Sequence, residues 1–300
     1  MIEQALREHL IAQKALAPYM AVYAGELAVF NQEAPADQDL LWSSGSQYGR
    51  IVFAVDIQHE LERTMGGMLS VDIMCREDEQ VPEDIEPIVR SLIHGWFFSS
   101  GTFSVAAQWR ESNYFTTPTE QVIGCTITFD LLAFPLMSTS DPDIITRFNE
   151  WTKARFPDLH VINLDELPAA AWKPSCGESA IYWRLGLRNA PRRVRSNYYT
   201  IWRNVFVQGH VFSDSNATAM DVSERIVIQA FRDKWLHKEG ETPLKINWDD
   251  ANKVDPAADP LRRGQITIEA TYGVIVAQGS NNTFNHIHTN ERSVGENEQK

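Results

Sequence analysis

Residues 124–132, GCTITFDLL, alternate apolar and polar side chains, and residues 264–273, GQITIEATYG, repeat this alternation 140 residues later. A period of two is typical of a β-strand that buries one of its faces. Threonine and acidic residues occupy most of the alternate positions, which indicates antiparallel sheets with one face toward water. The two stretches therefore predict equivalent strands in two parts of one chain.

Further matches at nearly the same spacing indicate that one unit occurs twice. Residues 109–113, WRESN, line up with residues 248–252, WDDAN, 139 residues later. Upstream matches at offsets of 139 to 141 are Pro18 with Pro157, Glu26-Leu27 with Glu166-Leu167, Pro35 with Pro174, and Leu41-Trp42 with Tyr182-Trp183. Each match alone is weak, so the predicted repeat depends on their common spacing.

Apolar residues at helical spacing lie at corresponding places in the two units. The spacing predicts helices over residues 1–16 and 82–97 in the first unit, and over 144–155 and 222–235 in the second. Alternation predicts strands over residues 50–57, 68–74, 124–134, 201–211 and 266–276. The expected order in each unit is helix, extended loop, two long strands, helix and two strands.

This order predicts an α+β fold of two tandem repeats, each an antiparallel β-sheet covered on one face by helices. The first domain is expected over residues 1–140 and the second over residues 141–279. Residues 138–142, STSDP, are turn residues and mark the boundary. Residues 280–300 are polar with few large apolar side chains, and we expect them to be disordered.

Charge and composition limit the classes of function. Residues 1–140 carry seven Lys and Arg against nineteen Asp and Glu, a net charge of −12, whereas residues 141–300 carry twenty against twenty-one, a net of −1. An acidic half repels nucleic acid, which favours protein partners or small ligands. No stretch is long and apolar enough for a membrane span, and residues 1–10 do not resemble a signal peptide.

Three cysteines, Cys75, Cys125 and Cys176, occur without a CxxC pair. Their odd number favours buried thiols in a reducing compartment over a disulfide framework.

Candidate catalytic and metal-binding patterns are weak. Phosphate-binding glycine loops are absent from the sequence, and His59-Glu60 lacks the second histidine of a zinc-protease helix because Arg63 takes its place. His286 and His288 have no acid or thiol at ligand spacing, so solvated side chains explain them. We therefore expect neither a metal nor another cofactor.

One carboxylate group leaves an enzymatic alternative open. Asp249, Asp250, Asp255 and Asp259 lie within eleven residues, and with His237 they could form a metal-dependent hydrolase site between the units. The matching residues of the first unit, Arg110-Glu111, do not repeat this pattern, so an ordinary loop explains the acids equally well.

Arginines are concentrated around the connection between two strands of the second unit. They are Arg184, Arg188, Arg192, Arg193, Arg195 and Arg203. This connection is either a solvated hairpin or a projecting arm that binds an acidic neighbour through bidentate contacts. The equivalent hairpin of the first unit contains Glu60, Glu62 and Arg63, and two arms at matching positions suggest an interaction role.

The order of elements resembles that of the tail terminator (tail-completion) proteins of tailed bacteriophages. The resemblance is carried by the predicted helix 1–16, the strands 50–57 and 68–74 with the arm between them, the helix 82–97 and the closing strand 124–134. It covers both units, although the family usually has one unit per chain.

The resemblance implies a structural virion protein of the tail or neck, assembled in the host bacterial cytoplasm. Such a protein forms a homo-oligomeric ring, here a trimer or a hexamer, that ends the tail tube and joins it to the head connector. Its partners would be the tail tube protein and the connector proteins, with DNA only passing through the lumen and no membrane contact. A tail tube or baseplate protein is the alternative within the same class.

Overall fold

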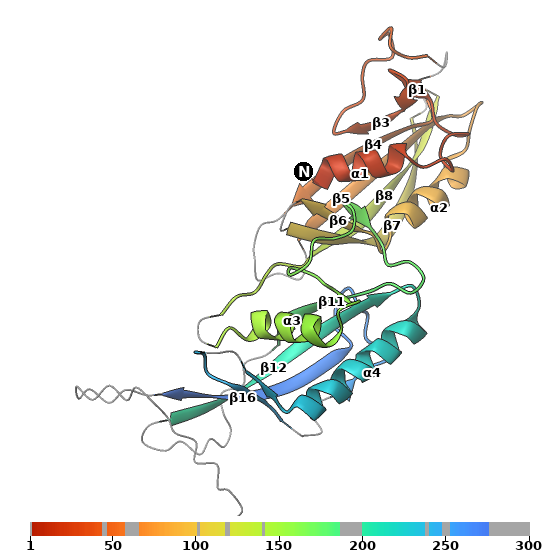
Figure 1. The fold of residues 1–300 in the computed structure, drawn as a ribbon. Coiled ribbons are helices and arrows are strands. Elements are labelled where there is room, and N and C mark those ends of the chain that lie inside the picture. The colour runs from red at the N-terminus through yellow and green to blue at the C-terminus, as the bar shows by residue number, and fades with distance from the viewer. Residues whose placement is uncertain are drawn as a thin grey trace, which may run out of the picture.

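The computed structural model describes residues 2–43, 47–57, 66–100, 103–117, 121–139, 142–186, 200–237, 240–247 and 253–275. Within these ranges the chain is a mixed α+β protein with four helices, two seven-stranded sheets and a two-stranded ribbon. Figure 1 shows the two sheets in separate halves of an elongated molecule, with α1 and α2 lying over the first sheet and α3 and α4 over the second.

The first half contains two helices and eight strands. They are α1 (Ile2–Ile11), β1 (Val22–Tyr23), β2 (Glu26–Leu27), β3 (Val29–Asn31), β4 (Arg50–Ile57), β5 (Gly67–Arg76), α2 (Pro82–Ile93), β6 (Phe97–Ser100), β7 (Phe103–Thr117) and β8 (Val122–Ala133). β1 and β2 form the separate ribbon. The sheet has the order β6-β7-β8-β5-β4-β3, in which only β3 and β4 are parallel.

The second half follows the same course. Its elements are α3 (Ile144–Arg155), β9 (His160–Val161), β10 (Ala171–Trp172), β11 (Ser179–Leu185), β12 (Thr200–Ser213), α4 (Asn216–Asp233), β13 (Trp235–Leu236), β14 (Leu244–Ile246), β15 (Lys253–Val254) and β16 (Ile266–Ile275). The order of the main path is β13-β14-β16-β12-β11-β9, and β15 also pairs with β16. As in the first half, the edge strand at one end, β9, is parallel to its neighbour β11, and the other pairs are antiparallel.

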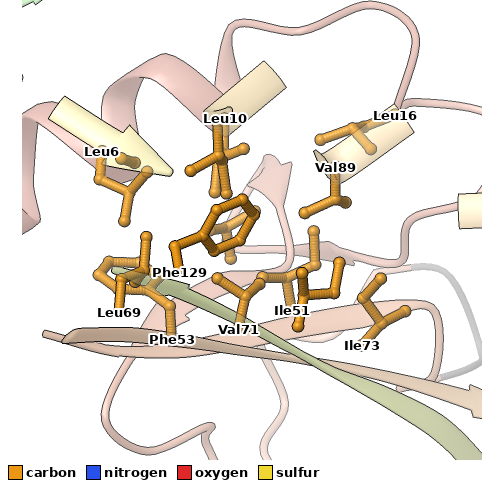
Figure 2. Packing of buried hydrophobic residues seen from close by; sticks show 14 of the residues in the cluster. Leu6, Leu10, Leu16, Ile51, Phe53, Leu69, Val71, Ile73, Val89 and Phe129 are labelled. Atoms are coloured by element: carbon orange, nitrogen blue, oxygen red, sulfur yellow. The ribbon is translucent and has the colours of Figure 1, made fainter. Parts of the chain in front are cut away.

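Helices and strands of the first half share one apolar core (Figure 2). Leu6 and Leu10 of α1 lie above the sheet, and Val89 of α2 lies beside them. Phe53 and Phe129 belong to the sheet side of the same cluster. The alternation along β4, β5 and β8 therefore produces one buried face, because successive side chains of a strand point to opposite faces.

In the core of the second half, one of the largest side chains packs opposite a glycine, a combination that the matching hairpin of the first half does not use. Trp183 on β11 is fully buried and lies opposite Gly209 on β12. A Cβ atom at Gly209 would lie 2.7 Å from the indole ring, so the missing side chain makes room for the tryptophan. In the β4–β5 hairpin of the first half, the paired residues Ile51 and Ile73 are both buried and have side chains of equal size.

Two details of the predicted repeat are wrong. Trp42 lies in a small cluster with Tyr23 and Phe30, whereas Trp183 is in the second core, so the match between Leu41-Trp42 and Tyr182-Trp183 fails. The helices predicted to reach Leu16, Phe97 and Trp235 end earlier, at Ile11, Ile93 and Asp233. α2 and α4 are each followed closely by a residue with left-handed backbone, Gly95 (φ 77°) or Lys234 (φ 60°), after which the chain enters the next strand.

One strand does not follow the predicted domain boundary at residue 140. β10 belongs by sequence to the second half, but it pairs with β6 and becomes the outermost strand of the first sheet. The chain between β9 and β11 therefore connects the two halves of the molecule. Local sequence patterns do not reveal such a pairing, because its partner lies over 70 residues upstream.

Candidate assembly surfaces

A buried aromatic cluster joins the two halves. Phe97 and Phe134 come from the first half, and Tyr182 and Phe212 come from the second. The ring centroids of Phe97 and Phe212 are 4.9 Å apart, and those of Phe134 and Tyr182 are 5.1 Å apart. These distances are typical of edge-to-face aromatic packing, which adds to the stabilisation from apolar burial. The two halves are thus held together by a shared apolar cluster.

A polar network borders this cluster. Arg262 donates to the carboxylate of Asp130 at 2.6 Å and to the amide oxygen of Gln108 at 2.6 Å. Gln108 in turn donates to Asp259 at 3.0 Å. Because the Asp130 side chain is only 10% exposed, its pairing with Arg262 is less screened than a surface ion pair. The network fixes the loop before β16 against the first sheet.

Two of the four predicted carboxylates, Asp255 and Asp259, lie within the described residues, and both accept hydrogen bonds from neighbouring groups. Asp255 accepts from the backbone of Ala257, and Asp259 accepts from the backbone of Leu261 as well as from Gln108. Asp249 and Asp250 lie outside the described residues. Among the residues that the structure describes, no group of three His, Cys, Asp or Glu side chains could hold a metal ion.

A buried histidine lies at the same joint. His210 bonds to the carbonyl oxygen of Pro260 at 2.7 Å, and its ring lies 5.7 Å from that of Tyr182. Burial lowers the pKa of His210 to about 4, although the bond to Pro260 acts in the opposite direction. The ring is therefore neutral at pH 7 and the halves are joined without a buried positive charge there.

A pocket of about 360 Å³ lies beside β13, the last strand of the second sheet among the described residues. Its lining includes Arg147, Trp151 and Arg155 from α3 and Asp233, Trp235 and His237 from the region that begins at the end of α4. Trp235 is 39% exposed, and its ring stacks on that of His237 with 5.9 Å between centroids. The candidate hydrolase residue His237 thus lies beside β13 in a pocket lined by tryptophans and by both acidic and basic side chains.

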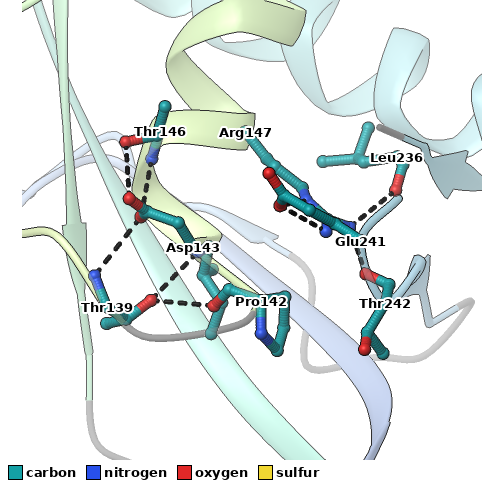
Figure 3. Close-up of polar contacts among 9 residues, drawn as sticks. Thr139, Pro142, Asp143, Thr146, Arg147, Leu236, Glu241 and Thr242 are labelled. Carbon is teal, nitrogen blue, oxygen red and sulfur yellow. Dashed lines mark hydrogen bonds and ion pairs between the residues drawn. The ribbon is translucent and has the colours of Figure 1, made fainter. Parts of the chain in front are cut away.

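Hydrogen bonds hold the walls of this pocket in place (Figure 3). Arg147, whose side chain is 2% exposed, donates to Glu241 at 2.7 Å and to the carbonyl oxygens of Leu236 and Thr242. Asp143 caps the start of α3 by accepting from Thr146. The pocket is therefore a preformed feature of the second half.

A second candidate surface is the ribbon formed by β12 and β16. The last pair between β11 and β12 is Leu185 with Val207, whereas β12 pairs with β16 back to Thr200. Among the described residues, 200–205 pair with β16 alone, and Trp202 on this stretch is 39% exposed. Figure 1 shows the ribbon extending away from the first half.

The arginines expected on this arm divide into three groups. Arg203 is exposed on the ribbon, but Arg184 is partly buried on β11 and bonds to Gln208 at 3.0 Å. Burial lowers the pKa of Arg184. The remaining arm residues, Arg188, Arg192, Arg193 and Arg195, lie outside the described residues.

The arm of the first half is also mostly outside the described residues. Glu60, Glu62 and Arg63 fall in this gap, together with His59. The described part of the hairpin stays within the sheet, because Gly67 at the start of β5 pairs both with Ile57 and with Leu131 of β8. His286, His288 and the expected disordered tail also lie outside the described residues.

A third surface is the loop between β3 and β4. Leu40 is 97% exposed and Leu41 is 53% exposed, although both are large apolar residues. Trp42 beside them folds back onto Phe30, with 5.7 Å between ring centroids. Sequence reasoning used Leu41-Trp42 only as a repeat marker and missed this exposed aliphatic pair.

The cysteines only partly match the expectation of buried thiols. Cys75 and Cys125 are buried, and burial raises their pKa values to about 12 and about 11. Cys176 is exposed, so the expectation is wrong for this residue. It lies on the connection between β10 and β11, which crosses the surface.

No protein-family model matches this sequence, and comparison with curated proteins finds no similar sequence. Among the described residues, no helix is both long and apolar enough to cross a membrane.

Proposed function

We propose that this chain is a structural subunit of a bacteriophage tail, in which two copies of a terminator-like unit have been fused. The observation that carries the proposal is the equal strand order of the two sheets, each with one parallel edge pair. In this proposal each unit is an antiparallel sheet with an added parallel edge strand, covered on one face by its helices. The domains are residues 1–140 and 141–279, with β10 exchanged across the boundary.

The joint between the halves supports a ring-forming role. At this joint, β6 of the first sheet pairs with β10, which lies in the connection between β9 and β11. Two similar units therefore meet through different surfaces. A contact of this heterologous kind generates a ring when its rotation closes. Three chains would then supply six similar units, and six chains remain the alternative.

In the assembled virion, the ring is proposed to end the tail tube and to contact the head connector, while DNA passes through its lumen. The net charge of −12 on residues 1–140 supports passage of DNA without binding, because like charges repel. The proposal requires complementary surfaces and assigns no catalytic residue or cofactor.

Negative-stain electron microscopy and native mass spectrometry of the full chain test this function, with and without tail tubes. We expect closed rings of one size that bind the ends of tubes. Open-ended cylinders would instead indicate a tube component. A monomer that neither assembles nor binds tube ends would overturn the proposal.

A further inference from the structure

Strand β7 of the first sheet runs past the end of its neighbour β6. The two strands pair only over the start of β7, as far as Ala106. The backbone N–H of Trp109 then donates to the ring of His94 at 3.1 Å. From residue 110 to Thr117, β7 pairs with β8 alone among the described residues. Its other side is an open sheet edge there.

The pairing register shows which backbone groups point out of this edge. In an antiparallel sheet, the N–H and C=O groups of successive residues point alternately to the two neighbouring strands. The carbonyl oxygen of Leu131 on β8 accepts from the loop before β5, so the even-numbered residues of β8 face β7. Opposite them lie the odd-numbered residues of 111–117. The backbone groups of Ser112, Tyr114 and Thr116 therefore point outward, and none of them has a hydrogen-bond partner within the described residues.

The residues of the open edge do not protect it from pairing. Exposed edge strands are usually protected by charged residues, prolines or bulges. A bulge and the charged pair Arg110-Glu111 precede the edge, but residues 112–117, SNYFTT, contain neither a charge nor a proline. Tyrosine, phenylalanine and threonine all favour strands. Tyr114 is 52% exposed, so the edge is accessible to a further strand.

Acidic residues surround this edge. Glu86 of α2 accepts from the hydroxyl of Ser112 at 2.7 Å, which holds the start of α2 beside β7. Burial raises the pKa of Tyr114, and Cys125, Glu86 and Glu83 act in the same direction. Glu83 is exposed on the first turn of α2, and Glu111 is exposed directly before the open edge. A partner strand with positive charges therefore fits this edge.

One guanidinium group is already bound beside the edge. Arg90 of α2 lies over the ring of Trp109 with 5.0 Å between the guanidinium carbon and the ring centroid. Arginine favours aromatic faces because the ring carries negative charge density above its plane. Trp109 is 38% exposed, so part of its surface remains accessible to a partner.

The chain contains a segment with the complementary charge. Residues 188–195, RNAPRRVR, carry four arginines and no acid. Within this region, residues 192–198, RRVRSNY, have no proline and include the strand formers Val194 and Tyr198. The segment precedes β12, whose ribbon with β16 extends away from the first half of its own chain (Figure 1). We therefore expect it to meet the first half of a neighbouring copy.

We propose that residues 192–198 of one copy add as a strand to the outer edge of β7 in the next copy, bonding to the backbone of Ser112, Tyr114 and Thr116. The occupant of the edge is thus a second copy of this protein. Its arginines lie among the acids of α2 and Glu111. Because the contact joins unlike surfaces, it continues from chain to chain and closes a ring when its rotation allows. The inference rests on the proposed function in that a ring requires a contact between copies.

Fluorescence anisotropy with a labelled peptide of residues 187–199 tests the edge. The receptor is the full chain carrying Arg192→Glu/Arg193→Glu/Arg195→Glu, so that its own segment does not compete. We expect saturable binding that weakens at high salt, because salt screens the charges. Thr116→Pro in this receptor should weaken binding about tenfold or more, because it removes an outward N–H and leaves the bonds to β8 in place.

Two further comparisons separate strand pairing from charge attraction. A peptide with Ser196→Pro/Asn197→Pro keeps its charge but lacks two adjacent N–H groups, one of which faces β7 in either register, so it should bind about tenfold more weakly. In the receptor, Glu111→Lys should weaken binding about fivefold. The matched control Glu33→Lys changes another exposed acid of the first half by the same charge and should bind as the receptor does.

Native mass spectrometry of the full chain tests the contact during assembly. The segment variant Arg192→Glu/Arg193→Glu/Arg195→Glu and the edge variant Thr116→Pro each retain one intact surface. Each alone should weaken self-association about tenfold or more. A one-to-one mixture should form heterodimers and stop there, because only one segment and one edge remain intact. Circular dichroism should show unchanged folding of both variants.

The outcomes separate this inference from the proposed function. Peptide binding that Thr116→Pro and Glu111→Lys leave unchanged would overturn the contact. Rings that persist in both chain variants would overturn it too but leave the terminator function intact. Open filaments that depend on both surfaces would support the contact and contradict the terminator function. Assembly lost in Thr116→Pro but kept in the segment variant would show that another strand occupies the edge and would overturn the inference.

Discussion

Arg262 and Asp130 form an ion pair with 2.6 Å between nitrogen and oxygen, although 132 residues separate them in the chain. Arg262 lies in the loop before β16 and Asp130 lies on β8, so this pair connects the second half to the first sheet. It borders the aromatic cluster that fixes the relative position of the two halves.

Replacing Asp130→Asn should destabilise the chain by about 1–3 kcal/mol, because the charge-assisted bonds to a shielded carboxylate are lost. Urea unfolding measures the change. A double-mutant cycle with Arg262→Gln should give a coupling of about 1 kcal/mol or more. Arg110, 3.8 Å from the same carboxylate, provides the comparison, and an equal coupling to Arg110→Gln would contradict the assignment.

Phe134→Ala should weaken the joint between the halves. Its ring is 1% exposed and contacts the rings of Phe97, Tyr182 and Phe212, so its removal should cost about 3–5 kcal/mol. Calorimetry should then show two transitions in place of one. Phe53→Ala, in the core of the first half alone, is the control that should lower stability without separating the transitions.

Stability should fall as the pH decreases from about 6.5 to about 4, in part because of His210. Its pKa is about 4 in the folded chain, so the unfolded chain, with the ordinary value of 6.5, binds more protons in this interval. His210→Gln should remove up to about 3 kcal/mol of this pH dependence. Thermal unfolding between pH 7 and pH 4.5 measures the slope. An unchanged slope in the variant would show that other groups cause it.

Gly209→Ala should destabilise the second half by about 1–3 kcal/mol, since the added methyl group overlaps the ring of Trp183. The same substitution should cost less in a Trp183→Leu background, where the large ring is absent. Circular dichroism melts of the four chains give the comparison. Equal costs in both backgrounds would mean that the indole ring is not the cause.

One thiol per folded chain should react with Ellman's reagent. Cys176 is exposed, whereas burial raises the pKa values of Cys75 and Cys125 to about 12 and about 11 and limits access to them. Cys176→Ser should abolish the rapid reaction, and all three thiols of the original chain should react in denaturant. Rapid labelling that persists in Cys176→Ser would contradict this prediction.

The sequence by itself determined most of the local elements. Alternation along residues 124–132 and 266–275 matched β8 and β16, since each strand keeps one face in the core. Helical spacing located all four helices of the described residues. It extended three of them too far, to Leu16, Phe97 and Trp235. In α2 and α4 the reason is that Trp96 and Trp235 keep the helical spacing of the apolar residues although the helix has already ended.

Only the tertiary structure decided how the halves meet and which surfaces stay open. The pairing of β10 with β6 and the packing of Phe134 on Tyr182 depend on partners far away in the chain, which local periodicity does not encode. The same holds for Leu40 and Leu41, whose exposure depends on what surrounds the loop in space. The pattern of apolar residues indicates which side chains are stabilised by burial, but the folded arrangement determines which of them are buried within one chain.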